Sequence, residues 1–248
     1  MNNIDIMNLE AKLLRGKTVQ FERLIIKPKT LGEIEELGVS EYFRLINLTT
    51  LTKEKIVGKK LKEVFEKYSF YQIVVNYDEL RELYLEFIRT FVLHDEDENS
   101  VRYEPVVDTI FVTYKDTIGK INNANFEDFL EFMRFVYHIT IVKKESERED
   151  IDEEMAELLK EFEEVEEKIT KDKGNEVTLT SMIEAICVKH NSLNLFNIWD
   201  YTMYQFIKTY YRIEQIDNSN NIMTALYTGN IDSKKIDIKD YHWAKKLV

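Results

Sequence analysis

Apolar residues recur at intervals of three and four along most of the chain, which is the pattern of one face of an amphipathic α-helix. This pattern predicts helices at 30–38, 40–48, 53–68, 78–93, 125–137, 151–169, 181–190 and 198–213. Within Thr178–Arg212, two such patterns are separated by the polar residues His190, Asn191 and Ser192. Because two amphipathic helices joined by a short loop pack against each other, this stretch predicts an αα-hairpin.

Polar residues at fixed spacing mark where helices begin. Thr30-x-x-Glu33 and Ser181-x-x-Glu184 both have the spacing of a capping box, in which two side chains bond to each other's backbone N–H groups. Thr178 is an alternative cap for the first helix of the hairpin. The two boxes predict helix starts near residues 30 and 181.

The second hairpin helix is expected to carry an aromatic stripe. Asn194 or Asn197 can cap this helix. Trp199 lies at helical spacing from Met203 and Phe206, so we expect its ring to be mostly buried. The polar sequence IDNSNN follows the stripe and predicts that the helix ends there.

Short strands are expected in the N-terminal part. The partly β-branched run Phe21–Lys27 predicts a strand, and Tyr103–Tyr114 is rich in strand-forming residues. The apolar run Ser69–Val75 fits either a strand or a buried helix, and Thr117–Asn123 contains Gly119 and predicts a turn. The expected fold is therefore mainly α: a multi-helix assembly with a few short strands in the N-terminal part and a C-terminal αα-hairpin unit.

The segment 145–168 is strongly acidic, with thirteen acidic residues against three basic ones. Its apolar residues repeat at alternating intervals of four and three, which is a heptad seam. Such a seam either docks on its own chain or binds a partner. The candidate partner-binding residues are Ile151, Met155, Leu158, Phe162 and Val165, together with Trp243 near the end of the chain. The alternative for Trp243 is that its ring packs onto the body of the fold.

A linker divides the chain. Residues 171–175 are polar and contain Gly174. We therefore expect a mostly helical N-terminal domain over 1–142, the acidic heptad helix and linker over 143–175, and a C-terminal helical unit over 176–248.

Composition excludes several classes of protein. The net charge of −12 argues against nucleic-acid binding, which requires a basic surface. The single cysteine fits a reducing compartment. The N-terminus lacks the pattern of a signal peptide, and no apolar run approaches the roughly 20 residues of a membrane span, so we expect neither secretion nor membrane insertion.

The sequence contains no motif that predicts catalysis. Cys187-x-x-His190 supplies only two of the ligands of a zinc ion, which commonly takes about four. The acidic loop 95–99 lacks the layout of a calcium loop, and the chain has no glycine-rich phosphate loop. We therefore expect a protein that is not an enzyme and has no catalytic, cofactor-binding or metal-binding residue.

Three stretches carry a resemblance to a known group of proteins. They are NLFNIWDYTMYQF with the terminal aromatic segment, FYQIVVNYDELRELYLEFI, and GKINNANFEDFLEF. The chain resembles structural or assembly proteins of phages that infect Gram-positive bacteria. The resemblance implies a tail-assembly chaperone in the host cytoplasm that binds the helical tape-measure protein.

Two alternatives to the chaperone stay open. One is a virion structural protein of the neck, tail or baseplate, also implied by the resemblance. The other is a diverged metal-dependent enzyme that uses the acidic loop 95–99. The expected partners are phage tail or other structural proteins, without nucleic acid or membrane, and the sequence leaves the oligomeric state open.

Overall fold

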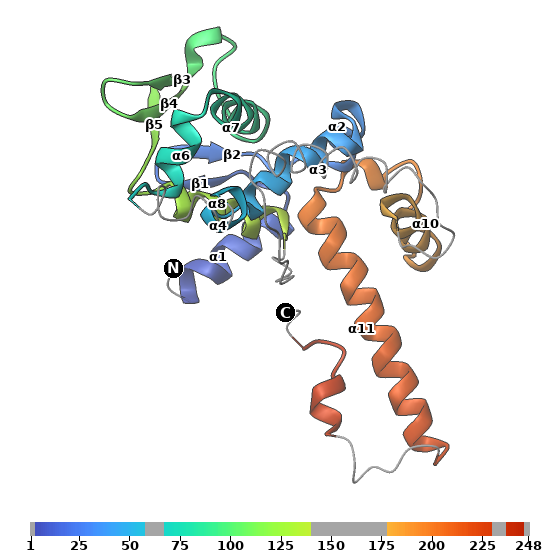
Figure 1. Cartoon of the computed structure of the whole chain (residues 1–248). Coiled ribbons are helices and arrows are strands. Elements are labelled where there is room, and N and C mark those ends of the chain that lie inside the picture. The colour runs from blue at the N-terminus through green and yellow to red at the C-terminus, as the bar shows by residue number, and fades with distance from the viewer. Residues whose placement is uncertain (1–2, 58–66, 140–177, 230–236, 246–248) are drawn as a thin grey trace.

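The computed structural model describes residues 3–57, 67–139, 178–229 and 237–245 (Figure 1). The α-helices are α1 (Asn3–Leu14), α2 (Leu31–Leu37), α3 (Val39–Asn47), α4 (Lys53–Val57), α6 (Phe70–Asn76), α7 (Asp78–Phe91), α8 (Phe126–Tyr137), α10 (Leu179–Lys189) and α11 (Met203–Tyr227). The strands are β1 (Val19–Phe21), β2 (Leu24–Ile26), β3 (Val101–Glu104), β4 (Thr109–Tyr114) and β5 (Thr117–Asn122). Short 3-10 turns are η1 (Leu48–Thr50), η2 (Glu98–Ser100), η3 (Ile198–Asp200) and η5 (Ile238–Tyr241). The fold is mainly helical, with its strands in the N-terminal part, as the sequence predicts.

The strands form two small antiparallel sheets. The prediction of one strand over Phe21–Lys27 is wrong, because the chain turns at Glu22, whose φ is +50°, and β1 and β2 form a hairpin. The prediction of a turn over 117–123 is also wrong: β5 lies there, and the second sheet has the order β3-β4-β5. Gly119 lies within β5 and faces Leu24, where a Cβ atom would come within 2.3 Å of Leu24 Cδ2. The glycine therefore allows the two sheets to approach closely.

The ambiguous run at 69–75 is a buried helix. Ser69 Oγ accepts a hydrogen bond from Gln72 N at 3.1 Å, and Gln72 Oε1 accepts one from Ser69 N at 2.9 Å. This reciprocal capping box starts α6. Tyr71 on α6 donates its hydroxyl to the carbonyl oxygen of Asp108 at 3.0 Å, which ties the helix to the three-stranded sheet.

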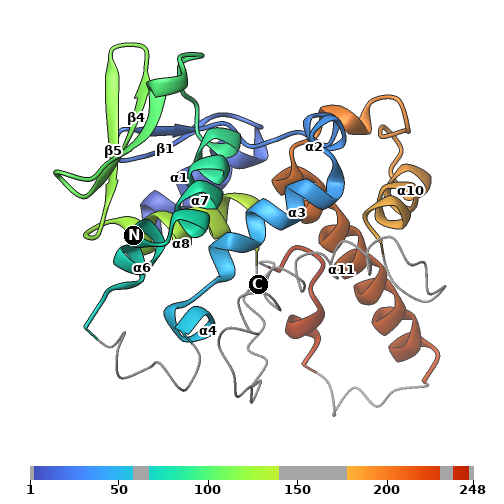
Figure 2. The ribbon, with the colours of Figure 1, turned by 45° about the horizontal axis from the view of Figure 1, so that its top comes forward.

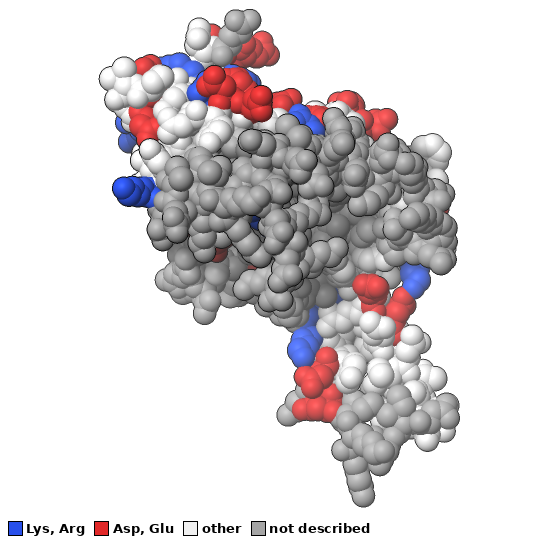
Figure 3. Space-filling model, in the orientation of Figure 1, with Lys and Arg blue, Asp and Glu red and all other residues white. Residues whose placement is uncertain are grey.

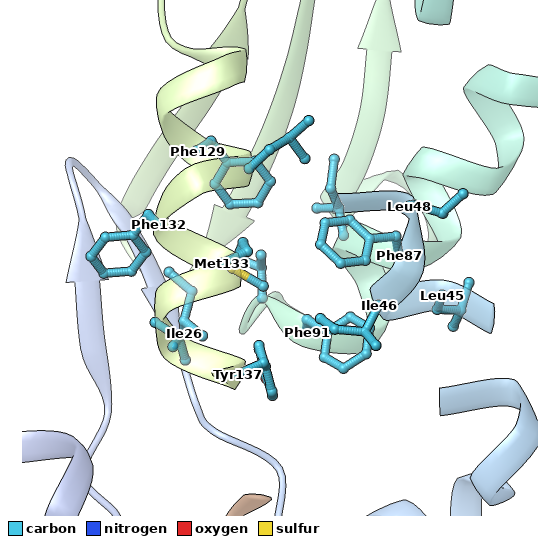
Figure 4. Packing of buried hydrophobic residues seen from close by; sticks show 14 of the residues in the cluster. Ile26, Leu45, Ile46, Leu48, Phe87, Phe91, Phe129, Phe132, Met133 and Tyr137 are labelled. Atoms are coloured by element: carbon cyan, nitrogen blue, oxygen red, sulfur yellow. The ribbon is translucent and has the colours of Figure 1, made fainter. Parts of the chain in front are cut away.

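Aromatic side chains from α7 and α8 form the centre of the core (Figure 4). The rings of Phe91 and Tyr137 meet edge to face with centroids 5.0 Å apart, and those of Phe87 and Phe129 lie 6.2 Å apart. Around them pack Ile26 of β2 and apolar residues of α3 and η1. The core thus joins the small strands to the helices of the N-terminal part.

The C-terminal αα-hairpin is confirmed, with different ends from those predicted. Helix α10 is capped by Thr178, the alternative cap, with Ser181 as its reciprocal partner. Helix α11 is capped by Thr202 in a box with Gln205. It runs for 25 residues, straight through the polar IDNSNN sequence where we expected it to end. No glycine or proline lies within α11, so the helix contains no strong helix-breaking residue at that sequence.

The start of α11 docks on the N-terminal part. Leu31 N donates to Tyr201 O at 2.8 Å, and Met203 N donates to Lys29 O at 3.0 Å. Phe206 is fully buried and belongs to the same core cluster as the aromatic residues of α7 and α8. The division of the chain near residues 142 and 175 stays a prediction, since residues 140–177 lie outside the described residues.

Candidate partner-binding surface

The five seam residues of the acidic segment, Ile151, Met155, Leu158, Phe162 and Val165, lie outside the described residues. Whether that seam docks on its own chain or binds a partner therefore stays open. Trp243 is described, and its ring is 56% exposed and stacks on His242 with centroids 5.7 Å apart. Trp243 thus remains available for contact with a partner.

The described C-terminal segment 237–245 lies along α11 (Figure 1). Arg212 Nη1 donates to Trp243 O at 2.6 Å and to Lys245 O at 2.9 Å. Gln215 Nε2 donates to His242 O at 2.9 Å. The segment is therefore tied to the helix by backbone carbonyls, and this leaves the indole ring exposed.

Helix α11 extends away from the N-terminal body as an arm (Figures 1 and 2). At 1.5 Å per residue it spans about 37 Å. Its first turns enter the core through Met203, Tyr204 and Phe206, whereas beyond Ile213 only Ser219 is buried among the described residues. The last ten residues of the helix carry no charge. The far end of α11, residues 218–227, therefore offers an uncharged surface.

Helix α10 packs beside α11 and braces it. Lys189 Nζ forms an ion pair with Asp217 Oδ2 on α11. Cys187, on the apolar stripe of α10, is half-buried. Burial raises the pKa of the Cys187 thiol, which is the opposite of what a cysteine nucleophile needs. His190 caps the helix, and its Nδ1 accepts a hydrogen bond from Ser192 N at 3.3 Å.

The loop between α10 and α11 exposes apolar side chains. Phe196 is 94% exposed and Leu195 is 55% exposed. The prediction that Trp199 is mostly buried as part of the α11 stripe is wrong. Trp199 lies in η3, before the helix begins, and is 37% exposed. The chain turns at Tyr201–Thr202 before α11 starts, and so the helical register of the stripe does not extend back to Trp199.

A family model described as the YomV second domain matches residues 170–248. The described part of this match comprises α10, the loop, α11 and the terminal segment. The protein is phage-related. No curated protein and no solved structure matches the chain. The match falls on the hairpin region in which the resemblance to phage proteins was seen, and we call residues 170–248 the YomV-like segment.

On the face that Figure 3 draws, Asp and Glu side chains lie near the three-stranded sheet and α7, and further charged side chains lie over α11 and the terminal segment. In the acidic loop, Asp95 Oδ1 accepts from Lys115 N at 2.8 Å, and Asp97 Oδ1 accepts from Asn99 N at 2.9 Å. These carboxylates serve as acceptors within turns. In the described ranges, no group of three or more His, Cys, Asp or Glu residues is placed to hold a metal ion.

No helix within the described ranges is both long and apolar enough to cross a bilayer. The 25-residue α11 combines apolar residues with charged residues and several asparagines.

Proposed function

We propose that this phage-related protein is a non-enzymatic morphogenesis factor, a tail-assembly chaperone that binds the helical tape-measure protein through its YomV-like segment. The observation that carries the proposal is the arm itself. The YomV-like segment presents exposed apolar side chains on α11, on the loop and on the terminal segment. Grouped exposed apolar side chains are typical of sites of protein association.

The shape and charge of the arm support a helical client. A helix of about 37 Å can lie along a long partner helix over several turns. Its uncharged last ten residues suit a client with an apolar stripe, since no carboxylate or ammonium group must be desolvated on contact there. Tyr227 at the far end of α11 is 83% exposed and extends this surface to the tip.

A virion structural protein is the second candidate. The observation that favours it is the firm anchoring of the arm, since α11 starts inside the core and Lys189 of α10 pairs with Asp217. An arm held in one orientation suits a permanent joint in a particle as well as it suits transient binding.

Co-expression tests the chaperone proposal. The tagged chain should retain the tape-measure protein of its own phage and should not retain a tape-measure protein from an unrelated phage. Mass spectrometry of purified virions then separates the two candidates. A chaperone should be absent from mature particles, whereas a structural protein should be present in a constant number of copies.

The metal-dependent enzyme is tested separately. Titration calorimetry with Mg²⁺ or Mn²⁺ should show no binding, because no group of three or more His, Cys, Asp or Glu residues in the described ranges is placed to hold a metal ion. Stoichiometric heat that disappears in the Asp95→Asn variant would reopen that alternative.

A further inference from the structure

The loop between α10 and α11 combines a highly exposed aromatic side chain with firmly anchored neighbours. Phe196 is 94% exposed. Leu193 on one side of it and Ile198 on the other are buried in the core cluster. The loop therefore cannot turn Phe196 inward without pulling one of these anchors out of the core, which would lose apolar burial.

Two asparagines fix the backbone around Phe196. Asn194 Oδ1 accepts hydrogen bonds from Phe196 N at 2.9 Å and Asn197 N at 3.2 Å. In return, Asn197 Oδ1 accepts from Asn194 N at 2.8 Å, and its Nδ2 donates to Ser192 O at 3.0 Å. This reciprocal pair holds the turn in one conformation, with the aromatic ring outside it.

Trp199 connects the turn to the rest of the protein. Its Nε1 donates to Leu195 O at 2.8 Å. Its backbone carbonyl lies close to Gly32 on α2, where a Cβ atom would be 3.4 Å from Trp199 O. The exposed turn is thus held against the N-terminal body as well as within itself.

We propose that the turn at Asn194–Asn197 is a preformed docking element that inserts Phe196, flanked by Leu195, into an uncharged apolar pocket of a partner protein. The proposal rests on the proposed function, since it names a part of the YomV-like segment that engages the partner. A preformed turn loses little conformational entropy on binding, which raises affinity. Aromatic side chains that enter pockets commonly dominate the energy of an interface.

The chemistry of the turn selects the partner. Residues 191–199 carry no charge, so a charged group in the facing pocket would be buried without a counterion at high cost. Self-association of this chain through the same turn is distinguished from binding to such a pocket by light scattering.

A lipid surface is also disfavoured as the occupant. Peripheral membrane sites combine aromatic residues with Lys or Arg, which are attracted to anionic headgroups. Residues 190–202 contain neither Lys nor Arg, and Asp200 is acidic. A protein pocket is therefore the occupant that the turn fits.

The test compares two equally exposed apolar positions in the full chain. Phe196→Ser removes the ring from the turn. The matched control is Val106→Ser, because Val106 is 90% exposed in the turn between β3 and β4, outside the YomV-like segment. Neither side chain contributes burial, so both variants should keep the melting temperature of the wild type. We expect Phe196→Ser to weaken retention of the co-expressed tape-measure protein at least tenfold, as loss of a hot-spot side chain does, and Val106→Ser to leave it unchanged.

A second pair of variants tests the preformed turn. Asn194→Ala removes the acceptor for Phe196 N and Asn197 N without touching the ring, and it should weaken retention severalfold. Asn194→Ser keeps an uncharged side-chain acceptor at this position and should restore part of the binding. Equal binding by Asn194→Ala and wild type would show that the turn need not be preformed.

The outcomes separate this inference from the proposed function. If the wild type binds the tape-measure protein and Phe196→Ser binds it equally, the docking element is refuted and the chaperone proposal stands. If the wild type does not bind, both are refuted. Light scattering and flotation with phosphatidylcholine and phosphatidylglycerol vesicles complete the set. An association that depends on Phe196 in either assay would reassign the turn to self-association or to lipid.

Discussion

The attachment of the arm to the body can be tested at Phe206. This side chain lies in the second turn of α11, is fully buried, and belongs to the core cluster that also contains Phe87 and Phe129. Phe206→Ala removes the ring and leaves a cavity, at a cost of about 3–5 kcal/mol. Since domains commonly have a stability of about 5–15 kcal/mol, this is a large fraction of the total.

The expected change in melting temperature follows from the size of the protein. For chains of about 150–250 residues, each kcal/mol shifts the melting temperature by roughly 2–4 °C, so Phe206→Ala should lower it by about 6–20 °C. The matched control on the same helix is Tyr227→Ala, because the ring of Tyr227 is 83% exposed and should cost little. Differential scanning calorimetry, with near-UV circular dichroism as a second probe, measures both variants.

The number of thermal unfolding transitions shows whether α11 and the N-terminal part share one core. If α11 and the N-terminal part share one core, the wild type and Phe206→Ala should each unfold in a single transition, and the whole transition should shift. Two transitions, with the N-terminal one unmoved by the substitution, would refute a shared core. They would show instead that the hairpin unfolds as a separate unit.

Single side chains in the core and at the contact between the two sheets should each have a measurable effect on stability. Tyr42 and Tyr84 are both fully buried, but Tyr84 Oη donates to Leu48 O at 2.8 Å whereas Tyr42 Oη has no partner among the described residues. Urea unfolding should therefore show Tyr84→Phe losing about 1 kcal/mol and Tyr42→Phe losing nothing or gaining stability; equal losses would contradict this. Gly119→Ala should cost about 1–3 kcal/mol by overpacking against Leu24, and combining it with Leu24→Ala in a double-mutant cycle should show strong coupling. Burial and the charge of Lys208 lower the pKa of His138 in the folded protein. As the pH falls below about 6.5, the usual pKa of histidine, the unfolded chain binds this proton more readily than the folded one, so the free energy of unfolding should decrease. His138→Asn, which tolerates the left-handed φ of +56°, should reduce the difference in urea midpoint between pH 7.5 and 5.5, and an unchanged difference would exclude His138 as its source.

The candidate site was only partly visible in the sequence. The sequence predicts Trp243 as a partner-binding residue, and the structure leaves its ring exposed. Phe196 is not among the residues that the sequence predicts to bind a partner, because whether a loop side chain points inward depends on which of its neighbours are buried in the core. A local signal was present, however. Asn194 and Asn197 stand three apart around Leu-Phe in an uncharged stretch, which is the spacing of a turn braced by its own side chains.

Local rules determined much of the architecture from the sequence alone. The Thr30-x-x-Glu33 box starts α2, and the apolar stripes of α7, α8 and the hairpin helices predicted where those helices lie. These features depend on hydrogen bonds and packing faces within a few residues of each other, so the sequence contains their full cause.

Tertiary contacts decided the rest. The apolar pattern of the run at 69–75 does not distinguish a strand from a buried helix. The Ser69–Gln72 cap starts the helix, and the hydrogen bond from Tyr71 Oη to Asp108 O holds it against the three-stranded sheet. Residues 117–122 form a strand because they pair with β4, and Gly119 fits there because Leu24, far away in the sequence, fills the space where a side chain would be. Trp199 is exposed because Leu31 binds Tyr201 O and thereby sets the chain path just before α11 begins. For Gly119 and Trp199 the deciding partner is distant in sequence, and only folding brings it into contact.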